Sequence, residues 1–115
     1  MGSAKTARRM RWTHAFLFRD AKMLDLGVPY GQQSDGKSIN NSDVIICTCT
    51  RNIGPIEVDR AYRWEMGRWA DLNSLLQNRA PGRITDGMIN DRGEIACTCE
   101  TWGSIRPCLL IPLKR

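Results

Sequence analysis

Apolar and polar positions alternate most clearly in two short tracts of the chain, residues 45–49 and 95–99. Their sequences, Ile-Ile-Cys-Thr-Cys and Ile-Ala-Cys-Thr-Cys, place one Ile and two Cys at positions i, i+2 and i+4. Because successive side chains of a strand point to opposite faces, this spacing puts those three residues on one face. Residues 44–50 are apolar on both faces, which predicts a strand in the centre of a sheet.

A second pattern, with a period close to that of an α-helix, runs from Glu57 to Asn78. Acidic residues occupy its first turn and Arg79 follows its end, as the helix dipole favours. Pro81-Gly82 would then stop a helix. The pattern predicts one main helix over about residues 57–79, with an apolar stripe that consists of Val58, Tyr62, Trp69, Leu72 and Leu76, widened by Ala61 and Leu75.

The C-terminal part of the chain predicts a β-meander. Residues 87–89 and 94–96 flank a four-residue turn that ends in Gly93. Residues 105–113 form the final strand, and the two prolines in it favour a place at the edge of the sheet.

Residues 12–26 have no clean period and indicate a short helix or an irregular strand, whereas residues 27–42 have the composition of a loop. The predicted fold class is α+β, with the main helix packed on an antiparallel sheet that includes the C-terminal meander. The chain divides into a basic N-terminal arm, residues 1–11, and a single α+β domain, residues 12–115.

Length and composition fit one soluble domain with a modest core. The chain has 115 residues, of which 42% are hydrophobic and 25% charged. It has no apolar run long enough to span a bilayer, and the apolar residues near the N-terminus are too few for a signal peptide. We therefore expect synthesis in the cytoplasm, without a signal peptide or a transmembrane segment.

The net charge of +5 is concentrated near the N-terminus. Within the first 22 residues, six basic residues accompany a single acidic residue, Asp20. Such an arm is either a solvated tail or a segment that docks on nucleic acid or on an acidic protein surface. In the second case Arg8, Arg9 and Arg11 are the candidate partner-binding residues.

Four of the five cysteines lie in the two tracts, and their spacing limits their chemistry. In an extended Cys-x-Cys segment the sulfurs are about 7 Å apart, which excludes a disulfide within either tract. Buried free thiols are favoured, with cross-strand disulfides Cys47–Cys97 or Cys49–Cys99 as one alternative. The other alternative is a tetrahedral zinc site built from Cys47, Cys49, Cys97 and Cys99. Cys108 is interpreted as a small apolar filler, and no cofactor is expected.

Two tryptophans are candidate contact residues. Trp64 lies off the apolar stripe of the predicted helix, with Arg60 and Arg68 one turn to either side. It forms either an exposed aromatic–arginine interface or a cover over the rim of the core. Trp102 lies at a predicted loop tip. The candidate partner-binding set is therefore Trp64, Arg68 and Trp102, together with the three arginines of the arm.

The C-terminal sequence resembles a known family. Its segments Asp86-Gly87-Met88-Ile89, Gly93-Glu94-Ile95 and Trp102-Gly103-Ser104-Ile105-Arg106-Pro107-Cys108-Leu109-Leu110-Ile111 look like the end of C-type-lectin-like domains related to the formylglycine-generating-enzyme fold. Such domains are common in phage virion proteins and bacterial surface proteins. The resemblance implies a fold and a virion-attached or displayed habitat. The family's calcium-ligand clusters have no matching positions in this chain, so no calcium or sugar site is carried over.

No phosphate-binding loop, isolated carboxylate pair or metalloprotease motif occurs in the sequence. The single histidine, His14, has no nucleophile predicted beside it. We therefore do not expect an enzyme.

The expected function is that of a non-enzymatic virion structural or binding module, such as a capsid decoration or fibre-associated protein. It would act through contacts with neighbouring virion or assembly subunits and form a homo-oligomer, with no membrane contact. The alternative is a small basic nucleic-acid-binding protein, with a zinc site on the four tract cysteines. A thiol enzyme that uses one of these cysteines is a third hypothesis.

Overall fold

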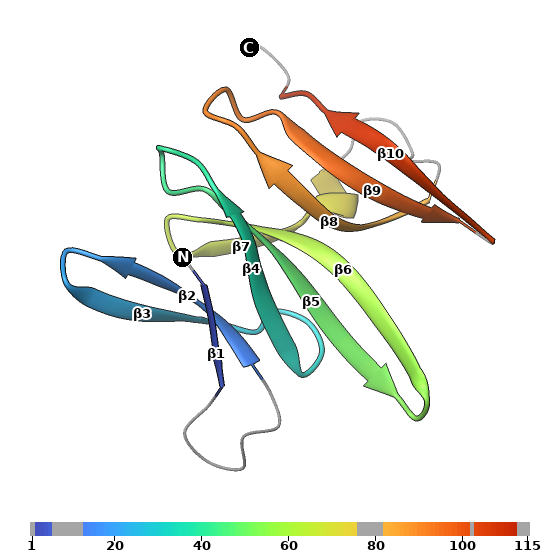
Figure 1. Cartoon of the computed structure of the whole chain (residues 1–115), viewed down its shortest axis with the longest axis horizontal. Helices are drawn as coiled ribbons and strands as arrows, with labels where there is room; N and C mark the ends of the chain where they lie inside the picture. The colour runs from blue at the N-terminus through green and yellow to red at the C-terminus, as the bar shows by residue number, and fades with distance from the viewer. Residues whose placement is uncertain (1, 6–12, 76–81, 102, 113–115) are drawn as a thin grey trace.

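The computed structural model describes residues 2–5, 13–75, 82–101 and 103–112. Within these ranges the chain forms ten β-strands and one short 3₁₀ turn, without an α-helix. The strands assemble into three antiparallel sheets with the orders β1-β2-β3, β4-β5-β6-β7 and β10-β9-β8 (Figure 1).

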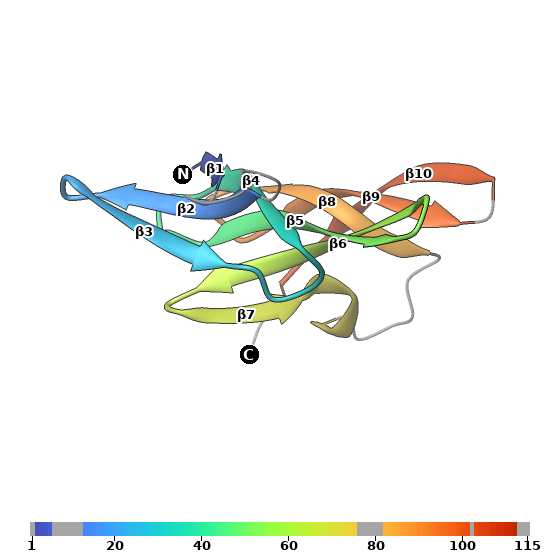
Figure 2. The same ribbon diagram turned by 90° about the horizontal axis from the view of Figure 1, so that it is seen from below.

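The first sheet contains β1 (Gly2–Lys5), β2 (Thr13–Arg19) and β3 (Lys22–Gly27). The central sheet contains β4 (Gln33–Ile39), β5 (Ile45–Ile53), β6 (Ile56–Glu65) and β7 (Arg68–Asp71), followed by the 3₁₀ turn η1 (Leu72–Leu75). The third sheet contains β8 (Arg83–Ile89), β9 (Ile95–Thr101) and β10 (Ser104–Leu110). The molecule is flat, with extents of 40 × 38 × 18 Å. Figure 2 shows the β2–β3 hairpin and the β9–β10 hairpin at its opposite ends.

The prediction of a main helix is wrong, and with it the α+β fold class. The predicted helix is instead the β6–β7 hairpin, followed by η1. Met66 and Gly67 connect the two strands, and both have positive φ, 51° and 82°. Positive φ at both central residues is the geometry of a two-residue hairpin turn, which pairs Trp64 with Trp69. Residues 76–79 of the predicted helix lie outside the described residues.

The error has a physical reason. Val58 and Tyr62 are four residues apart, a spacing that fits one face of a helix and equally one face of a strand. Aromatic and β-branched side chains favour the strand, and β6 pairs with β5 from Ile56 to Trp64. The backbone hydrogen bonds that a helix would form locally are therefore formed with a neighbouring strand.

The predictions of a central strand and of a C-terminal meander are confirmed. β5 is central, with β4 and β6 as its neighbours, and β8, β9 and β10 form the predicted meander with β10 at its edge. The segment without a clean period is the β2–β3 hairpin, whereas the predicted loop of residues 27–42 contains β4. The start of the predicted arm, Gly2–Lys5, pairs with β2 and so belongs to the first sheet.

The strands β4-β5-β6 and β8-β9-β10 repeat one arrangement, which we call the first unit and the second unit. The Cys-Thr-Cys tracts are their middle strands. The first strand of each unit is interrupted by a register shift, between Gly36 and Ser38 in β4 and between Ile84 and Asp86 in β8.

The first turn of each unit is also the same. The side-chain oxygen of Asn40 accepts hydrogen bonds from the N–H groups of Ser42 and Val44, at 2.9 and 3.0 Å. The side-chain oxygen of Asn90 accepts equivalent bonds from the N–H groups two and four residues later, both at 3.0 Å. Asparagine is favoured in turns for this local bonding. The two turns thus have one structure at positions fifty residues apart in the sequence.

β5 separates two apolar cores. On one face, Ile45 and Cys47 pack with Trp64 and with residues of the first sheet, Ala15, Leu17 and Leu26. On the other face, Ile46 packs with Ala61, Leu72 and the inward residues of the second unit, which are Ile84, Ile95, Cys97 and Cys99. The first sheet therefore covers one face of the first unit, and the cysteine-bearing face of the second unit covers the other.

Candidate functional site

The second unit presents an exposed apolar surface on the side away from the first unit. Strand register places Met88, Ala96 and Leu109 in one row across β8, β9 and β10. Met88 and Leu109 are 67% and 58% exposed, and Ile105, on the same face of β10, is 70% exposed. Since directly opposed side chains lie about 5 Å apart, Met88, Ala96 and Leu109 are contiguous, and Ile105 lies further along the same face of β10. We call Met88, Ala96, Ile105 and Leu109 the outer face.

The equivalent face of the first unit is covered. Ile46, the counterpart of Ala96, is fully buried. Thr48 is also buried, and its Oγ1 donates a hydrogen bond of 3.0 Å to the carbonyl oxygen of Thr85 in β8. The same side of the same three-strand arrangement is therefore a packed interface in the first unit and an open surface in the second.

The edge of the second unit is less suited to contact than its face. Among the described strands β10 pairs only with β9, and Pro107 lies at its middle. Ser104 pairs with Thr101 at the hairpin end, and counting along the ladder puts Pro107 at a position where the backbone nitrogen points away from β9. Proline removes a hydrogen-bond donor there, which discourages the addition of another strand.

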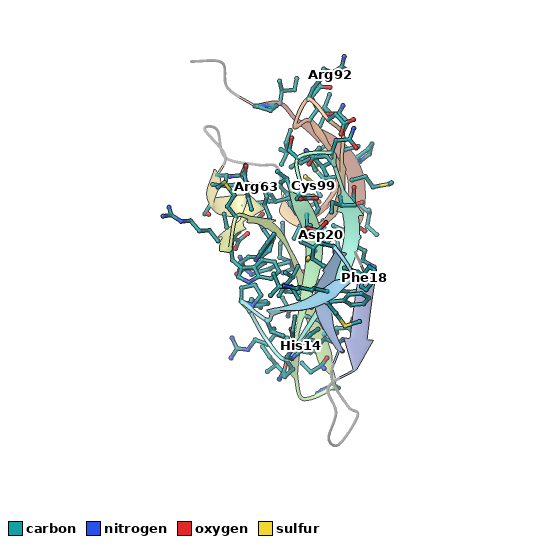
Figure 3. The ribbon with its side chains drawn as sticks, turned by 90° about the vertical axis from the view of Figure 1, so that its left-hand side faces the viewer. His14, Phe18, Asp20, Arg63, Arg92 and Cys99 are labelled. Atoms are coloured by element: carbon teal, nitrogen blue, oxygen red, sulfur yellow. A yellow bond between two sulfur atoms is a disulfide. The ribbon has the colours of Figure 1, made fainter. Side chains whose placement is uncertain are left out.

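A second apolar patch lies on the β2–β3 hairpin. Phe18 and Met23 are cross-strand partners, 58% and 62% exposed, and Leu24 on the reverse side is also exposed. Figure 3 shows Phe18 on this hairpin and Cys99 within the body of the molecule. We call Phe18 and Met23 the hairpin patch. It lies at the end of the molecule opposite to β10.

The predicted contact residues are placed as follows. Trp64 is only 9% exposed and packs in the core with Ile45 and Cys47, because it lies on the inward face of β6, so its predicted role as an exposed aromatic contact is wrong. Arg68 is exposed at the start of β7. The predicted contacts Arg8, Arg9, Arg11 and Trp102 lie outside the described residues, and their roles stay predictions.

An aromatic–arginine contact does occur, but it involves Arg60, which lies on the same strand as Trp64. The guanidinium of Arg60 lies 5.4 Å from the centre of the Tyr30 ring and forms a 3.1 Å ion pair with Asp71. Tyr30 stacks in turn on Tyr62. No sequence pattern predicts this contact, because Tyr30 lies in a segment with loop composition. These contacts of Tyr30 with Arg60 and Tyr62 hold its loop against β6 of the central sheet.

The four tract cysteines do not come together. Cys47 lies in the core beneath the first sheet, whereas Cys97 and Cys99 face the other core, so neither the predicted Cys₄ zinc site nor a disulfide between the tracts is formed. Cys97 instead forms a disulfide with Cys108, and the prediction that Cys108 is only a filler is wrong. The Sγ of Cys99 lies 2.7 Å from the Sγ of Cys108.

Burial raises the pKa of the free thiols. The pKa of Cys47 rises to about 12, chiefly because burial disfavours the thiolate, and the negative charge of Asp35 adds to the effect. The pKa of Cys49 is raised for the same main reason, with further contributions from Cys47 and Asp71. Burial also raises the pKa of Cys99. A nucleophilic cysteine needs a lowered pKa, so burial makes these three thiols poor nucleophiles at neutral pH.

His14 does not lie beside a sulfur. Its Nδ1 is 3.1 Å from both carboxylate oxygens of Asp25, on the next strand of the first sheet. In the described part of the chain, none of the helical structure is long and apolar enough to cross a membrane.

Comparison with protein-family models, with curated proteins and with solved structures gives no match, so the function has to be inferred from the residues of this chain.

Proposed function

We propose that this chain is a non-enzymatic structural or binding module that acts through protein–protein contacts and assembles head to tail into homo-oligomers. The resemblance of the C-terminal sequence to domains of phage virion proteins favours a virion as the place of assembly. There the chain would be a capsid decoration or fibre-associated protein. The observation that carries the proposal is the open outer face of the second unit, whose counterpart in the first unit is a buried interface.

Exposure of this kind indicates a missing partner. Single exposed apolar residues are ordinary, but contiguous patches on monomers are small and commonly mark contact sites. Met88, Ala96 and Leu109 form such a continuous row. The first unit supplies the precedent within the chain, since there Ile46, the counterpart of Ala96, packs against the inward residues of the second unit.

The hairpin patch of a second copy is the partner that fits the outer face. Both surfaces are apolar, and they lie at opposite ends of the flat molecule. A contact between two different surfaces of one chain is heterologous, and it builds rings or filaments.

Sedimentation velocity tests the proposal. The wild-type chain should form a concentration-dependent series of oligomers. Leu109→Glu on the outer face and Phe18→Glu on the hairpin patch should each sediment as a monomer. An equal mixture of the two variants should form a dimer and nothing larger, because each variant keeps one intact surface. Met66→Glu, at an 89% exposed position in the β6–β7 turn, is the matched control and should assemble like the wild type.

Two outcomes would reject self-assembly of this kind. If the wild-type chain stays monomeric at its highest soluble concentration, the proposed homo-oligomer is rejected. If the Phe18→Glu variant assembles like the wild type, the hairpin patch is not the surface that binds the outer face. The virion itself is tested separately: the chain should remain with purified intact particles, and its recovery only in the soluble fraction would reject that location.

A further inference from the structure

Three of the five cysteines converge on the inward face of the β9–β10 hairpin. Cys97 and Cys108 are direct cross-strand partners, and Cys99 lies two residues along on the same face. The three Sγ atoms all lie within 4.8 Å of one another. Among the described residues, this is the only group of three or more metal-ligating side chains that meets in this way.

We propose that the three sulfurs form a binding site for one soft d¹⁰ cation, Cu⁺ or Zn²⁺, in the reduced chain. Thiolates are the ligands that select these cations, and hard cations such as Mg²⁺ and Ca²⁺ require oxygen ligands. Three thiolates complete a trigonal site for Cu⁺, whereas Zn²⁺ would take a water molecule as its fourth ligand.

The spacing fits such a cation. A Zn–S bond of about 2.3 Å requires sulfurs about 3.8–4.0 Å apart, for tetrahedral or trigonal geometry. In the oxidised chain the three sulfurs all lie within 4.8 Å of one another, with Cys97 bonded to Cys108 and Cys99 at 2.7 Å from Cys108. Once the Cys97–Cys108 bond is reduced, the sulfurs have to move apart by side-chain rotation to surround one central ion.

The surroundings of the cluster also suit a bound cation. Cys97 and Cys99 are 7% and 1% exposed, which protects the site from competing water. Cys108 is only half-buried and lies on the edge strand β10, which gives the ion a way in. Arg106 pairs with Cys99 across the ladder and so lies on the same face, where its positive charge would offset the excess negative charge of three thiolates.

The disulfide is the closed, oxidised state of the same cluster. A phosphine reductant transfers two electrons to the Cys97–Cys108 bond, the sulfurs take up two protons from water, and the phosphine leaves as its oxide. The cation then replaces three thiol protons, one each from Cys97, Cys99 and Cys108.

Metal titration of the reduced, desalted chain in the absence of oxygen tests the site. Competition with a chromophoric Zn²⁺ chelator and with a Cu⁺ chelator should each give one cation per chain, and the tighter of the two identifies the preferred ion. Loading with Co²⁺ should give thiolate-to-cobalt charge-transfer absorption, whose intensity counts the sulfur ligands. Cys99→Ser and Cys108→Ser should each weaken binding by more than about 100-fold, since changes outside the ligands themselves already produce 10- to 100-fold losses.

The first unit supplies the matched control. It has the same Cys-Thr-Cys tract, but Tyr62 stands opposite Cys47 where Cys108 stands opposite Cys97. Cys49→Ser should therefore leave the stoichiometry and the charge-transfer band unchanged. Absence of binding by the reduced wild-type chain would reject the site. So would an equal loss in Cys49→Ser and Cys99→Ser variants that both keep the wild-type far-ultraviolet circular dichroism spectrum.

Discussion

The two Cys-Thr-Cys strands, β5 and β9, have nearly the same sequence, the same preceding turn and the same place in a three-strand unit. Their surroundings are different. Cys47 and Cys49 face Tyr62 and Arg60 across the ladder, whereas Cys97 and Cys99 face Cys108 and Arg106. The two units differ at one cross-strand position, which is Tyr62 in the first unit and Cys108 in the second. With Tyr62 the tract has two buried free thiols, whereas with Cys108 it belongs to a three-sulfur cluster. The chemistry of such a tract is decided by its neighbour and not by the tract.

The opposite faces of the two strands differ as well. β5 is covered on both faces, by the first sheet and by the second unit. β9 is covered only on its cysteine face, and Ala96 is exposed where Ile46 is buried. A strand with two covered faces is a core strand, whereas one with a single covered face leaves a surface for a partner. This difference is the physical basis of the assembly proposed above.

The largest effect is expected at the second position of each tract. Ile46→Ala should lower the free energy of unfolding by about 2–5 kcal/mol, because it removes a fully buried side chain and leaves a cavity. Ala96→Ser, at the equivalent exposed position, should change it by less than about 0.5 kcal/mol. Urea denaturation of both variants measures the pair. Similar losses at the two sites would contradict the view that only the first unit has this face covered.

A smaller effect is expected from pH. The pKa of the Cys47 thiol is raised from an ordinary value of 9.0 to about 12, so the folded chain keeps a proton that the unfolded chain loses in this range. Stability from this group is complete below pH 9 and falls as the pH rises from 9 towards 12, by at most about 1.4 kcal/mol per pH unit.

Urea denaturation between pH 8 and 11 measures this slope. Cys47→Ala should make the fall in the free energy of unfolding with pH less steep, because one titrating thiol is lost. In the second unit, Cys97 and Cys108 are joined in a disulfide and do not titrate while they remain oxidised. An identical pH dependence in the wild type and in Cys47→Ala would show that the buried thiol does not contribute.

The smallest effect is expected at the threonines of the tracts. Thr48→Val should lower the free energy of unfolding by about 1 kcal/mol, because it removes the buried hydrogen bond to the carbonyl oxygen of Thr85. Thr98→Val, on the partly exposed equivalent position of β9, should have an effect within about 0.5 kcal/mol. Thermal unfolding of the two variants side by side provides the comparison, and a reversed order would count against the assigned covering of β5.

Part of the fold could be predicted from local patterns. Alternation identified β5 and β9, and proline placed β10 at an edge. The helix prediction failed because Val58 and Tyr62 satisfy the periods of both a helix and a strand, and because Met66-Gly67 is a weak turn signal in the sequence. β4 was missed because its glycine, serine and charged residues resemble a loop, yet β5 supplies its hydrogen bonds.

The candidate site was less accessible to prediction. Trp64 was expected at the surface because the helical pattern placed it off the apolar stripe, and the strand moved it into the core. Ile105 and Leu109 share one face of the last strand by alternation, and only the structure shows that this face is the exposed one. Cys108 lies on the opposite face, and its partner Cys97 could be identified only from the register of β9 and β10.

The sequence by itself determined which side chains share a face, because alternation and turn chemistry are local properties of the chain. It set Ile45, Cys47 and Cys49 on one face, and Ile95, Cys97 and Cys99 on another. Only the tertiary structure decided which of those faces are covered, and by which residues. The reason is that strand pairing and sheet packing join residues that are far apart in sequence, and the energy of a buried face comes from those contacts.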